Sequence, residues 1–189
     1  MSSSRSSSAA RDIALIAVFA GIMAALMPLA IPTPTVPITL QSMGVILAGA
    51  ILGGRRGGAS IILFLALVAL GLPLLAGGRG GLGVFVAPSV GYLVGYVILA
   101  FVVGFVTYRW KAPFPLVKAL IFNIIASYII LYGCGAIGLM IVQGLSLKAA
   151  LAANIPFLIG DAIKAILATV VAKGVHSAYP KLLPTRTSA

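Results

Sequence analysis

The sequence predicts an all-α integral membrane protein with six transmembrane helices and both termini on the cytoplasmic side. Composition, the spacing of the apolar runs and the distribution of positive charge lead to this prediction. Hydrophobic residues make up 61% of the 189 positions, charged residues 8%, and the mean hydropathy is +1.20. Soluble domains carry about 45–50% apolar and about 25% charged residues. The composition therefore excludes a soluble globular domain, a disordered chain and a collagen-like chain.

The apolar runs have the length of membrane spans. A transmembrane helix needs about 20 apolar residues to cross about 30 Å of hydrocarbon. No charged residue occurs from position 13 to 54, but Pro32, Pro34 and Pro37 divide this stretch, because proline removes a backbone donor and clashes with the preceding turn. The predicted spans are residues 13–31, 38–54, 58–75, 90–108, 116–142 and 151–172.

The segments outside the spans are short. Residues 1–12 are rich in serine and contain two arginines, and they are predicted to be a disordered tail. The apolar run that follows is too long for a signal peptide, so we expect it to be retained as the first span. Residues 13–176 then form one six-helix transmembrane domain, and residues 177–189 form a cytoplasmic tail.

Positive charge sets the predicted orientation. The chain has 13 Lys and Arg residues and two acidic residues. Arg79 and Lys148 fall on one side of the predicted spans, and Lys164 lies within the last span. The other ten fall on the opposite side, which the positive-inside rule places in the cytoplasm. Because these residues alternate with apolar runs, the net charge of +11 indicates membrane topology and not a nucleic-acid partner. The ten are Arg5, Arg11, Arg55, Arg56, Arg109, Lys111, Lys118, Lys173, Lys181 and Arg186.

Two ionisable residues lie within the last predicted span. An ionisable residue inside a membrane segment is costly and is by default a candidate for function. Asp161 and Lys164 are three positions apart, so they lie on one helix face. They can pair as a structural lock, or both can face a polar ligand. The ligand interpretation is favoured because Asp161 is the only acid in any predicted span.

A glycine-rich loop joins the third and fourth spans. Five of the seven residues from 77 to 83 are glycine, which permits unusual dihedral angles and close approach to a ligand. A plain connector would be more polar than this loop, so we expect a lid that packs partly on the bundle. Gln41 opens the second span near the same face, and its amide can bond to a neighbouring helix or to a ligand. The candidate residues of the loop are Gly77, Gly78, Arg79, Gly80 and Gly81, with Tyr92 just beyond it.

Small residues recur on the first span. Ala17, Gly21 and Ala25 are spaced four apart, which lets another helix approach closely. The motif fits packing within the bundle and also fits a docking surface for a partner. The sequence alone does not decide between them, because Gly44/Ala48 and Gly91/Gly95 repeat the pattern.

Several motifs are missing from the sequence. There is no Walker A, HExxH or GxSxG motif, so an enzyme is disfavoured. One cysteine and one histidine exclude an internal disulfide and a Cys/His metal cluster. We therefore expect no catalytic residues, no metal and no cofactor.

Five segments of the sequence form a recognisable combination. They are Val-Pro-Ile-Thr-Leu-Gln at 36–41, Leu-Ala-Gly-Ala-Ile-Leu-Gly-Gly-Arg-Arg-Gly at 47–57, Gly-Leu-Pro at 71–73, the glycine loop leading to Gly91-Tyr92, and Gly-Asp-X-X-Lys at 160–164. Together they resemble the BioY family, the biotin-binding S components of energy-coupling factor (ECF) transporters. The resemblance covers roughly residues 13–173. One departure is Ala-Pro-Ser-Val-Gly at 87–91, where the family pattern is Gly-Pro-Thr-Gly-Gly.

The resemblance implies high-affinity capture of biotin from outside a bacterial cytoplasmic membrane. Asp161 and Lys164 would then bind a polar end of biotin, and the sequence alone does not decide which end it is. The glycine loop and Gln41 would close the site. Tyr92 would pack on the ligand, and Arg79 or backbone N–H groups would take the carboxylate. The implied partners are a transmembrane coupling subunit, two ATPase subunits and the lipid bilayer, with the first helix docking through its small residues. A homo-oligomer is left open.

Two other interpretations remain at this point. The chain could be an S component for another vitamin, such as thiamine or riboflavin. It could also be a structural membrane subunit in which Asp161 and Lys164 merely pair.

Overall fold

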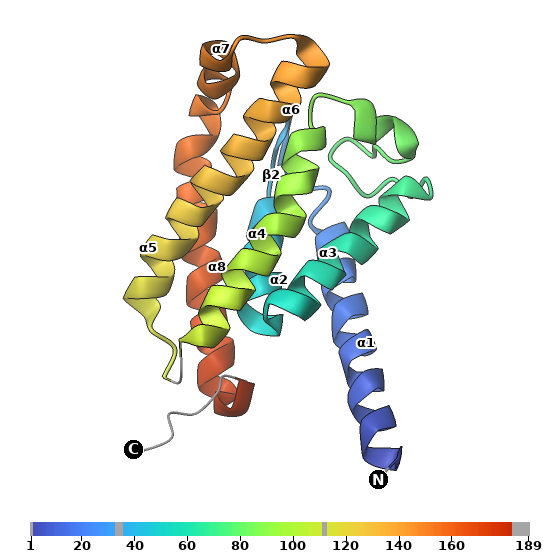
Figure 1. The fold of residues 1–189 in the computed structure, drawn as a ribbon, viewed down its shortest axis with the longest axis vertical. Coiled ribbons are helices and arrows are strands. Elements are labelled where there is room, and N and C mark those ends of the chain that lie inside the picture. Colours follow the sequence, from blue (N-terminus) through green and yellow to red (C-terminus); the bar gives the residue numbers. More distant parts are fainter. Residues whose placement is uncertain (1, 33–35, 111–112, 183–189) are drawn as a thin grey trace.

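Long apolar helices run side by side through the molecule (Figure 1). The structure is a computed structural model that describes residues 2–32, 36–110 and 113–182. Short turns join most neighbouring helices, and a longer loop joins α3 to α4. The helices are α1 (Ser2–Ala25), α2 (Gln41–Leu52), α3 (Gly54–Ala69), α4 (Val90–Arg109), α5 (Leu116–Ser127), α6 (Gly133–Gln143), α7 (Leu147–Ala152) and α8 (Leu158–Ala178).

A helix occupies each of the six predicted apolar regions, but the helices differ in length. Within the described residues, three helical segments are long and apolar enough to cross a membrane: Val90–Arg109, Leu116–Gln143 and Leu147–Ala178. The second joins α5 to α6 through a π-helical turn, Tyr128–Tyr132. The apolar helix α2 has only 12 residues, since the second predicted span begins with a strand.

The prediction of a disordered tail over residues 1–12 is wrong for residues 2–12, which are helical. Helix α1 begins at Ser2 and ends at Ala25, six residues before the predicted end of the first span. No proline or glycine interrupts the chain before position 21, so the first helix extends into the polar segment. An ion pair of 2.9 Å between Asp12 and Arg56 ties this part of α1 to α3.

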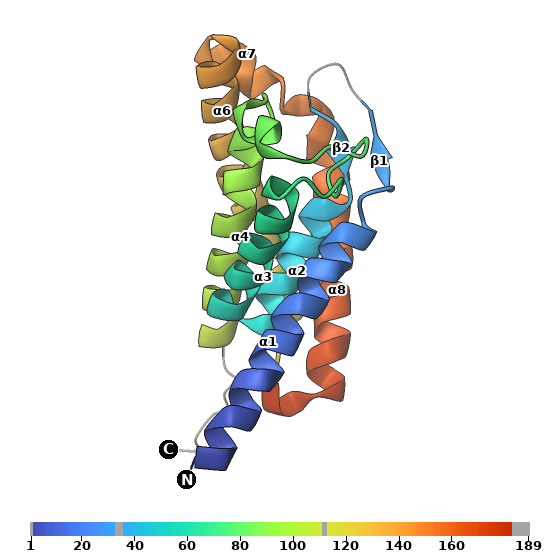
Figure 2. The ribbon, with the colours of Figure 1, turned by 90° about the vertical axis from the view of Figure 1, so that its right-hand side faces the viewer.

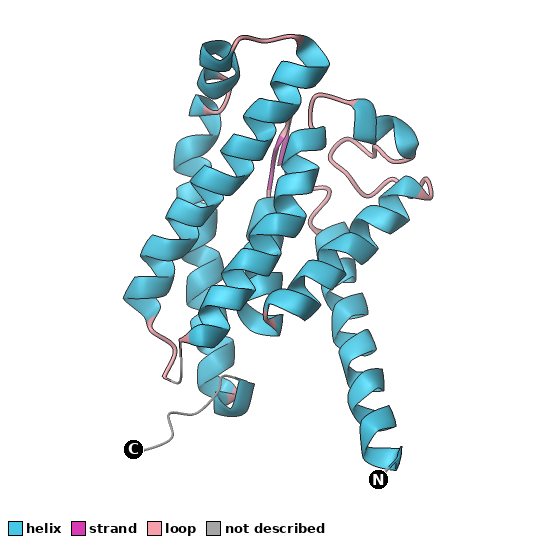
Figure 3. Ribbon diagram, in the orientation of Figure 1, coloured by secondary structure: helices cyan, strands magenta, loops and turns pink. Residues whose placement is uncertain are grey.

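The prediction of an entirely α-helical fold needs one correction. Two short antiparallel strands, β1 (Ala30–Ile31) and β2 (Ile38–Thr39), pair with Ala30 opposite Thr39. Figure 3 shows them as the strands of the described chain. Proline fixes extended backbone next to each strand, and β-branched residues favour it. The segment between α1 and α2 therefore contains a two-stranded ribbon.

The two ends of the bundle differ in character. Helix α1 begins and α8 ends at the same end of the molecule (Figures 1 and 2). The opposite end carries the β1–β2 ribbon, the glycine-rich loop and α7. The candidate site residues therefore gather at the end remote from the beginning of α1.

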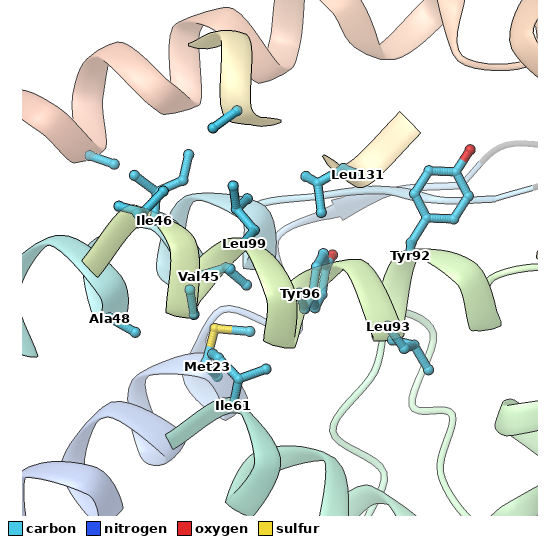
Figure 4. Packing of buried hydrophobic residues seen from close by; sticks show 14 of the residues in the cluster. Met23, Val45, Ile46, Ala48, Ile61, Tyr92, Leu93, Tyr96, Leu99 and Leu131 are labelled. Atoms are coloured by element: carbon cyan, nitrogen blue, oxygen red, sulfur yellow. The ribbon is translucent and has the colours of Figure 1, made fainter. Parts of the chain in front are cut away.

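Large apolar side chains fill the centre of the bundle. Met23 of α1, Val45 of α2, Ile61 of α3 and Leu99 of α4 are all fully buried (Figure 4). Helices α2 and α4 approach closely because Gly49 has no side chain. A Cβ there would meet the backbone oxygen of Ala100. Small residues and interdigitating apolar chains together hold these four helices in contact.

The structure separates small residues that pack inside the bundle from those that do not. A Cβ on Gly44 would lie 2.7 Å from the sulfur of Met23, and one on Gly95 would lie 3.3 Å from Cβ of Cys134. By contrast, a Cβ on Gly21 would meet nothing within 4 Å. Ala17 and Ala25 are exposed as well, so this stripe of α1 faces away from the bundle.

Replacing Gly49 with alanine is expected to destabilise the protein, because the new methyl group overlaps the backbone of α4. Overpacking of this kind costs about 1–3 kcal/mol. Gly21→Ala adds the same methyl group where space is open, so its melting temperature should be unchanged or slightly higher. Thermal unfolding of both purified variants in detergent makes the comparison. Equal melting temperatures would contradict the close contact of α2 with α4.

Candidate ligand-binding site

The first turns of α8 carry a buried ion pair. Nζ of Lys164 lies 2.8 Å from Oδ1 of Asp161, and each residue is only 7% exposed. Helix α8 begins at Leu158, so Asp161 lies in the first turn, where the helix dipole favours negative charge. The structure thus places both residues on one face, as their spacing predicts.

Two hydroxyl groups from other helices complete the surroundings of this pair. Oγ of Ser42, in the first turn of α2, lies 3.2 Å from Oδ1 of Asp161 and 3.3 Å from Nζ of Lys164. The hydroxyl of Tyr132 donates to Oδ2 of Asp161 at 3.0 Å. Both carboxylate oxygens and the ammonium group therefore have partners, which is what makes a buried ion pair tolerable.

The π-helical turn between α5 and α6 positions Tyr132. π-turns are rare and occur often at functional sites. Here the rings of Tyr128 and Tyr132 stack at 5.3 Å, and the hydroxyl of Tyr128 donates to the carbonyl of Leu158 at 2.7 Å. The turn thus fixes the start of α8 and directs Tyr132 at Asp161. Sequence reasoning missed Tyr132 and Ser42; a polar aromatic within an apolar span was the available signal.

Tyrosines of α4 form the neighbouring wall. Tyr92 and Tyr96 lie one turn apart on the same side of α4 (Figure 4). The hydroxyl of Tyr92 donates to Oδ1 of Asn154 at 2.7 Å, and the hydroxyl of Tyr96 lies 3.3 Å from Oγ1 of Thr39 in β2. Tyr92, Tyr96 and Thr39 therefore lie beside the ion pair, and Asn154 holds the hydroxyl of Tyr92.

A small cavity opens beside the ion pair. Its volume is about 40 Å³, and an adjoining cavity of about 30 Å³ shares Thr39, Tyr92 and Tyr96 with it. Pockets for small ligands usually measure about 300–1,000 Å³, whereas a cavity of this size holds only a few waters. The cavity is therefore smaller than a typical small-ligand pocket. The larger of the two is lined by Val36, Pro37, Thr39, Ser42, Tyr92, Tyr96, Leu131, Phe157, Asp161 and Lys164.

Gln41 links three elements above the site. Its side-chain nitrogen donates to the carbonyl of Met23 at 3.2 Å and to that of Leu74 at 2.8 Å, and the residue is 1% exposed. It also lines the smaller cavity. Both donors of the amide are thus engaged by backbone, so Gln41 ties α1 and the glycine-rich segment to the start of α2.

The glycine-rich loop lies at the end of the bundle that carries the β1–β2 ribbon, and its glycines have different surroundings. Gly77, Gly78 and Gly81 have positive φ angles of 70° to 80°, which favour glycine. Gly77 and Gly78 line an outer groove with Arg79. Gly80 packs against the carbonyl of Leu72. The backbone N–H of Gly81 donates to the carbonyl oxygen of Val68 at 2.7 Å.

Arg79 connects the loop with the interior. Its backbone pairs with Leu75 in both directions at 3.0 and 3.1 Å, and Nε donates to the carbonyl of Ala76 at 3.1 Å. The residue lines both the outer groove and the smaller cavity. The structure therefore brings Asp161, Lys164 and Tyr92 together and places Arg79 on the far side of Tyr92.

Metal-binding residues do not cluster in the described part of the chain. No group of three or more His, Cys, Asp or Glu side chains in it could hold a metal ion.

A sequence profile of the BioY family matches residues 1–181. The chain belongs to the BioY family. It is 41% identical over 184 residues to a biotin transporter BioY from Rhizobium etli, covering 93% of this chain and 98% of that protein. It is 42% identical over 188 residues to a biotin transporter BioY from Rhodobacter capsulatus, again covering 93% and 98%.

A solved structure supports the membership. The crystal structure of the S-component for biotin from an ECF-type ABC transporter superposes with a TM-score of 0.84 at 32% identity. The match covers 90% of this chain and 93% of that one. The two chains therefore share their fold over most of their lengths.

Removing only one charge of the buried pair should be costly. Asp161→Leu leaves the ammonium of Lys164 buried without its carboxylate, and losing one partner typically costs about 3–5 kcal/mol. The double variant Asp161→Leu/Lys164→Met removes both charges and should regain most of that stability. Thermal unfolding in detergent compares the three proteins. A double variant as unstable as the single one would show that the charges do not act as a pair.

Proposed function

We propose that this chain captures biotin with high affinity and mediates its uptake as the S component of an ECF-type ABC transporter. The observation that carries the proposal is the buried Asp161–Lys164 pair beside a cavity in a chain of the BioY family. The relatives from Rhizobium etli and Rhodobacter capsulatus are biotin transporters. The function is therefore that of a transporter subunit and not of an enzyme.

The chemistry of the pair fits the ureido group of biotin. This group offers two N–H donors and one carbonyl acceptor. Asp161 accepts from the N–H side, and Lys164 donates to the carbonyl oxygen. Hydrogen bonds to charged groups are stronger than neutral ones, and exclusion of water strengthens them further.

The tyrosines and Arg79 fit the remainder of the ligand. Tyr92 and Tyr96 offer ring faces and edges to the apolar bicycle. Arg79 lines the adjoining cavity, so its guanidinium and nearby backbone N–H groups meet the carboxylate at the end of the aliphatic chain. Glycines 77, 78, 80 and 81 allow the backbone of this loop to approach the ligand.

Binding requires exchange of partners and opening of the cavity. In the structure Ser42 and Tyr132 bond to Asp161, so the ureido group must replace at least one of these contacts. The cavity of about 40 Å³ must enlarge several-fold. The β1–β2 ribbon and the glycine-rich loop are proposed to move, and Gln41 ties Leu74, which precedes the loop, to α1 and α2.

The membrane arrangement follows from charge and apolar length. We propose six membrane-spanning segments in a bacterial cytoplasmic membrane, with the beginning of α1 and the end of α8 in the cytoplasm. Biotin then enters from the outer face, where the ribbon and the glycine-rich loop lie. The ion pair lies near that face.

Asp161→Asn is expected to weaken biotin binding at least tenfold, which corresponds to about 1.4 kcal/mol. The amide keeps the shape of the side chain but loses the charge-assisted bond. Calorimetric titration of the purified protein in detergent measures the affinity. Asp12→Asn is the matched control, because Asp12 is the other acid and pairs with Arg56 in α3; its biotin affinity should not change.

The same titration with thiamine and riboflavin tests the ligand. A measurable heat of binding with biotin, and with neither thiamine nor riboflavin, supports the proposal. Heat with another vitamin would keep an S component but overturn biotin. No heat with any of the three, in folded and ligand-free protein, would favour a structural subunit. An unchanged biotin affinity in Asp161→Asn would overturn the assignment of the site.

The exposed stripe of α1 is proposed to dock on the transmembrane coupling subunit, which in turn contacts two ATPase subunits. Ala17, Gly21 and Ala25 are exposed, and Gly21 has open space around its Cα. Small residues packed inside this bundle have close neighbours, so an outward stripe of them fits a helix of a partner.

Gly21→Leu should block assembly but leave biotin binding unchanged, because leucine adds bulk to the outer face of α1 only. Co-purification with the coupling and ATPase subunits measures assembly. Gly174→Leu is the control, since Gly174 on α8 also has nothing within 4 Å of its Cβ position. Normal assembly of Gly21→Leu would exclude this stripe as the docking surface.

A further inference from the structure

A groove of about 730 Å³ lies at the end of the bundle where α1 begins, remote from the biotin site. Asp12 of α1 lines one side, and residues of α4 from Phe101 to Arg109 line the other. The first turn of α3 and its glycines form the floor. Gly54 and Gly104 have no side chains, so the backbones of α3 and α4 come close together here. A Cβ on Gly104 would meet the backbone nitrogen of Gly54.

The charges in this groove are not balanced within the chain. Arg55, Arg56 and Arg109 line it. The sequence contains two acidic residues, Asp12 and Asp161. Asp12 pairs with Arg56 at 2.9 Å, and Asp161 pairs with Lys164. No aspartate or glutamate side chain remains for Arg55 and Arg109, so a carboxylate side chain that neutralises them must come from another molecule.

The wall formed by α4 combines aromatic rings with a cation. Phe101, Phe105 and Arg109 are spaced four apart and form one stripe. The two rings stack at 6.0 Å with an angle of 12°, and Cζ of Arg109 lies 4.3 Å from the ring centre of Phe105. Each phenylalanine is 46% exposed. The stripe therefore offers an apolar surface that ends in a guanidinium.

We propose that this groove binds an anionic glycerophospholipid. Its phosphate lies between Arg55 and Arg109, and one acyl chain follows Phe101 and Phe105 along the bundle. Guanidinium groups bind phosphate oxygens in pairs. Basic pockets between transmembrane helices on the cytoplasmic side hold anionic headgroups, and the groove has the volume of a ligand pocket, about 300–1,000 Å³.

A lipid explains more of this groove than a soluble anion does. Free phosphate would engage the arginines but leave both phenylalanine rings uncovered. An acidic protein segment would neutralise the charge, but it would bring polar backbone to an aromatic wall that faces the membrane. Only a molecule with an anionic head and an apolar chain matches both parts of the surface.

Native mass spectrometry of the full chain tests the proposal with phosphatidylglycerol and phosphatidylcholine of identical acyl chains. The wild-type protein should retain phosphatidylglycerol in preference. The double variant Arg55→Gln/Arg109→Gln should bind it about 30-fold more weakly, from the usual contribution of each basic residue near an anionic headgroup. Lys118→Gln/Lys173→Gln removes two charges at the same end, outside the groove, and should bind as the wild type does. Thermal unfolding verifies that each variant is folded.

Four results would overturn the proposal. The wild-type protein could retain phosphatidylcholine as well as phosphatidylglycerol, or the lysine control could lose as much phosphatidylglycerol binding as the arginine variant. The arginine variant could also bind phosphatidylglycerol as tightly as the wild type. Lastly, equimolar glycerol phosphate could displace the lipid, which would indicate a soluble anion. Absence of bound lipid together with arginine-dependent association of the coupling subunit would assign the groove to a protein partner.

Discussion

Two opposite charges buried on one turn of α8 impose the main constraint on this structure. Removing an ion from water costs several kcal/mol even in real proteins, and a pair is tolerated only when its remaining polar atoms are bonded. Residues close in sequence to Asp161 supply only one of its partners, Lys164. The other bonds come from Ser42 on α2 and Tyr132 at the π-helical turn, so α2, the α5–α6 segment and α8 must converge at this point.

The same completeness accounts for the small volume of the cavity beside the pair. Every polar atom of the pair already has a partner, and the cavity beside it holds only a few waters. On the proposed function, a ligand is bound by replacing internal bonds, which makes recognition depend on donors and acceptors in the right places. Because Ser42 lies next to Gln41, and Gln41 holds both α1 and the glycine-rich segment, exchange at the pair is mechanically linked to the loops above it.

Close helix packing divides the surface of the bundle into parts with different roles. Glycines inside the bundle, such as Gly49, bring α2 and α4 into contact. The small residues of α1 point outward instead. The arginines and phenylalanines of the groove face the surface at the end of the bundle where α1 begins. The surfaces proposed for ligand, protein partner and lipid are therefore separate, and a change at one need not disturb the others.

The sequence by itself determined the fold class in outline, the six apolar helical regions and the face shared by Asp161 and Lys164. These features follow from composition and from helical periodicity, which are local properties. It did not determine where α1 begins, the β1–β2 ribbon or the π-helical turn. Hydropathy reports burial in the membrane and not backbone geometry.

The tertiary structure alone decided which residues surround the pair and which small residues face outward. Ser42 lies 119 positions from Asp161, and Tyr132 lies 29 positions from it. Contacts over such separations depend on how whole helices are placed, so spacing in the sequence cannot reveal them. For the same reason Ala17-x-x-x-Gly21 and Gly91-x-x-x-Gly95 look alike as motifs, although only the second packs inside the bundle.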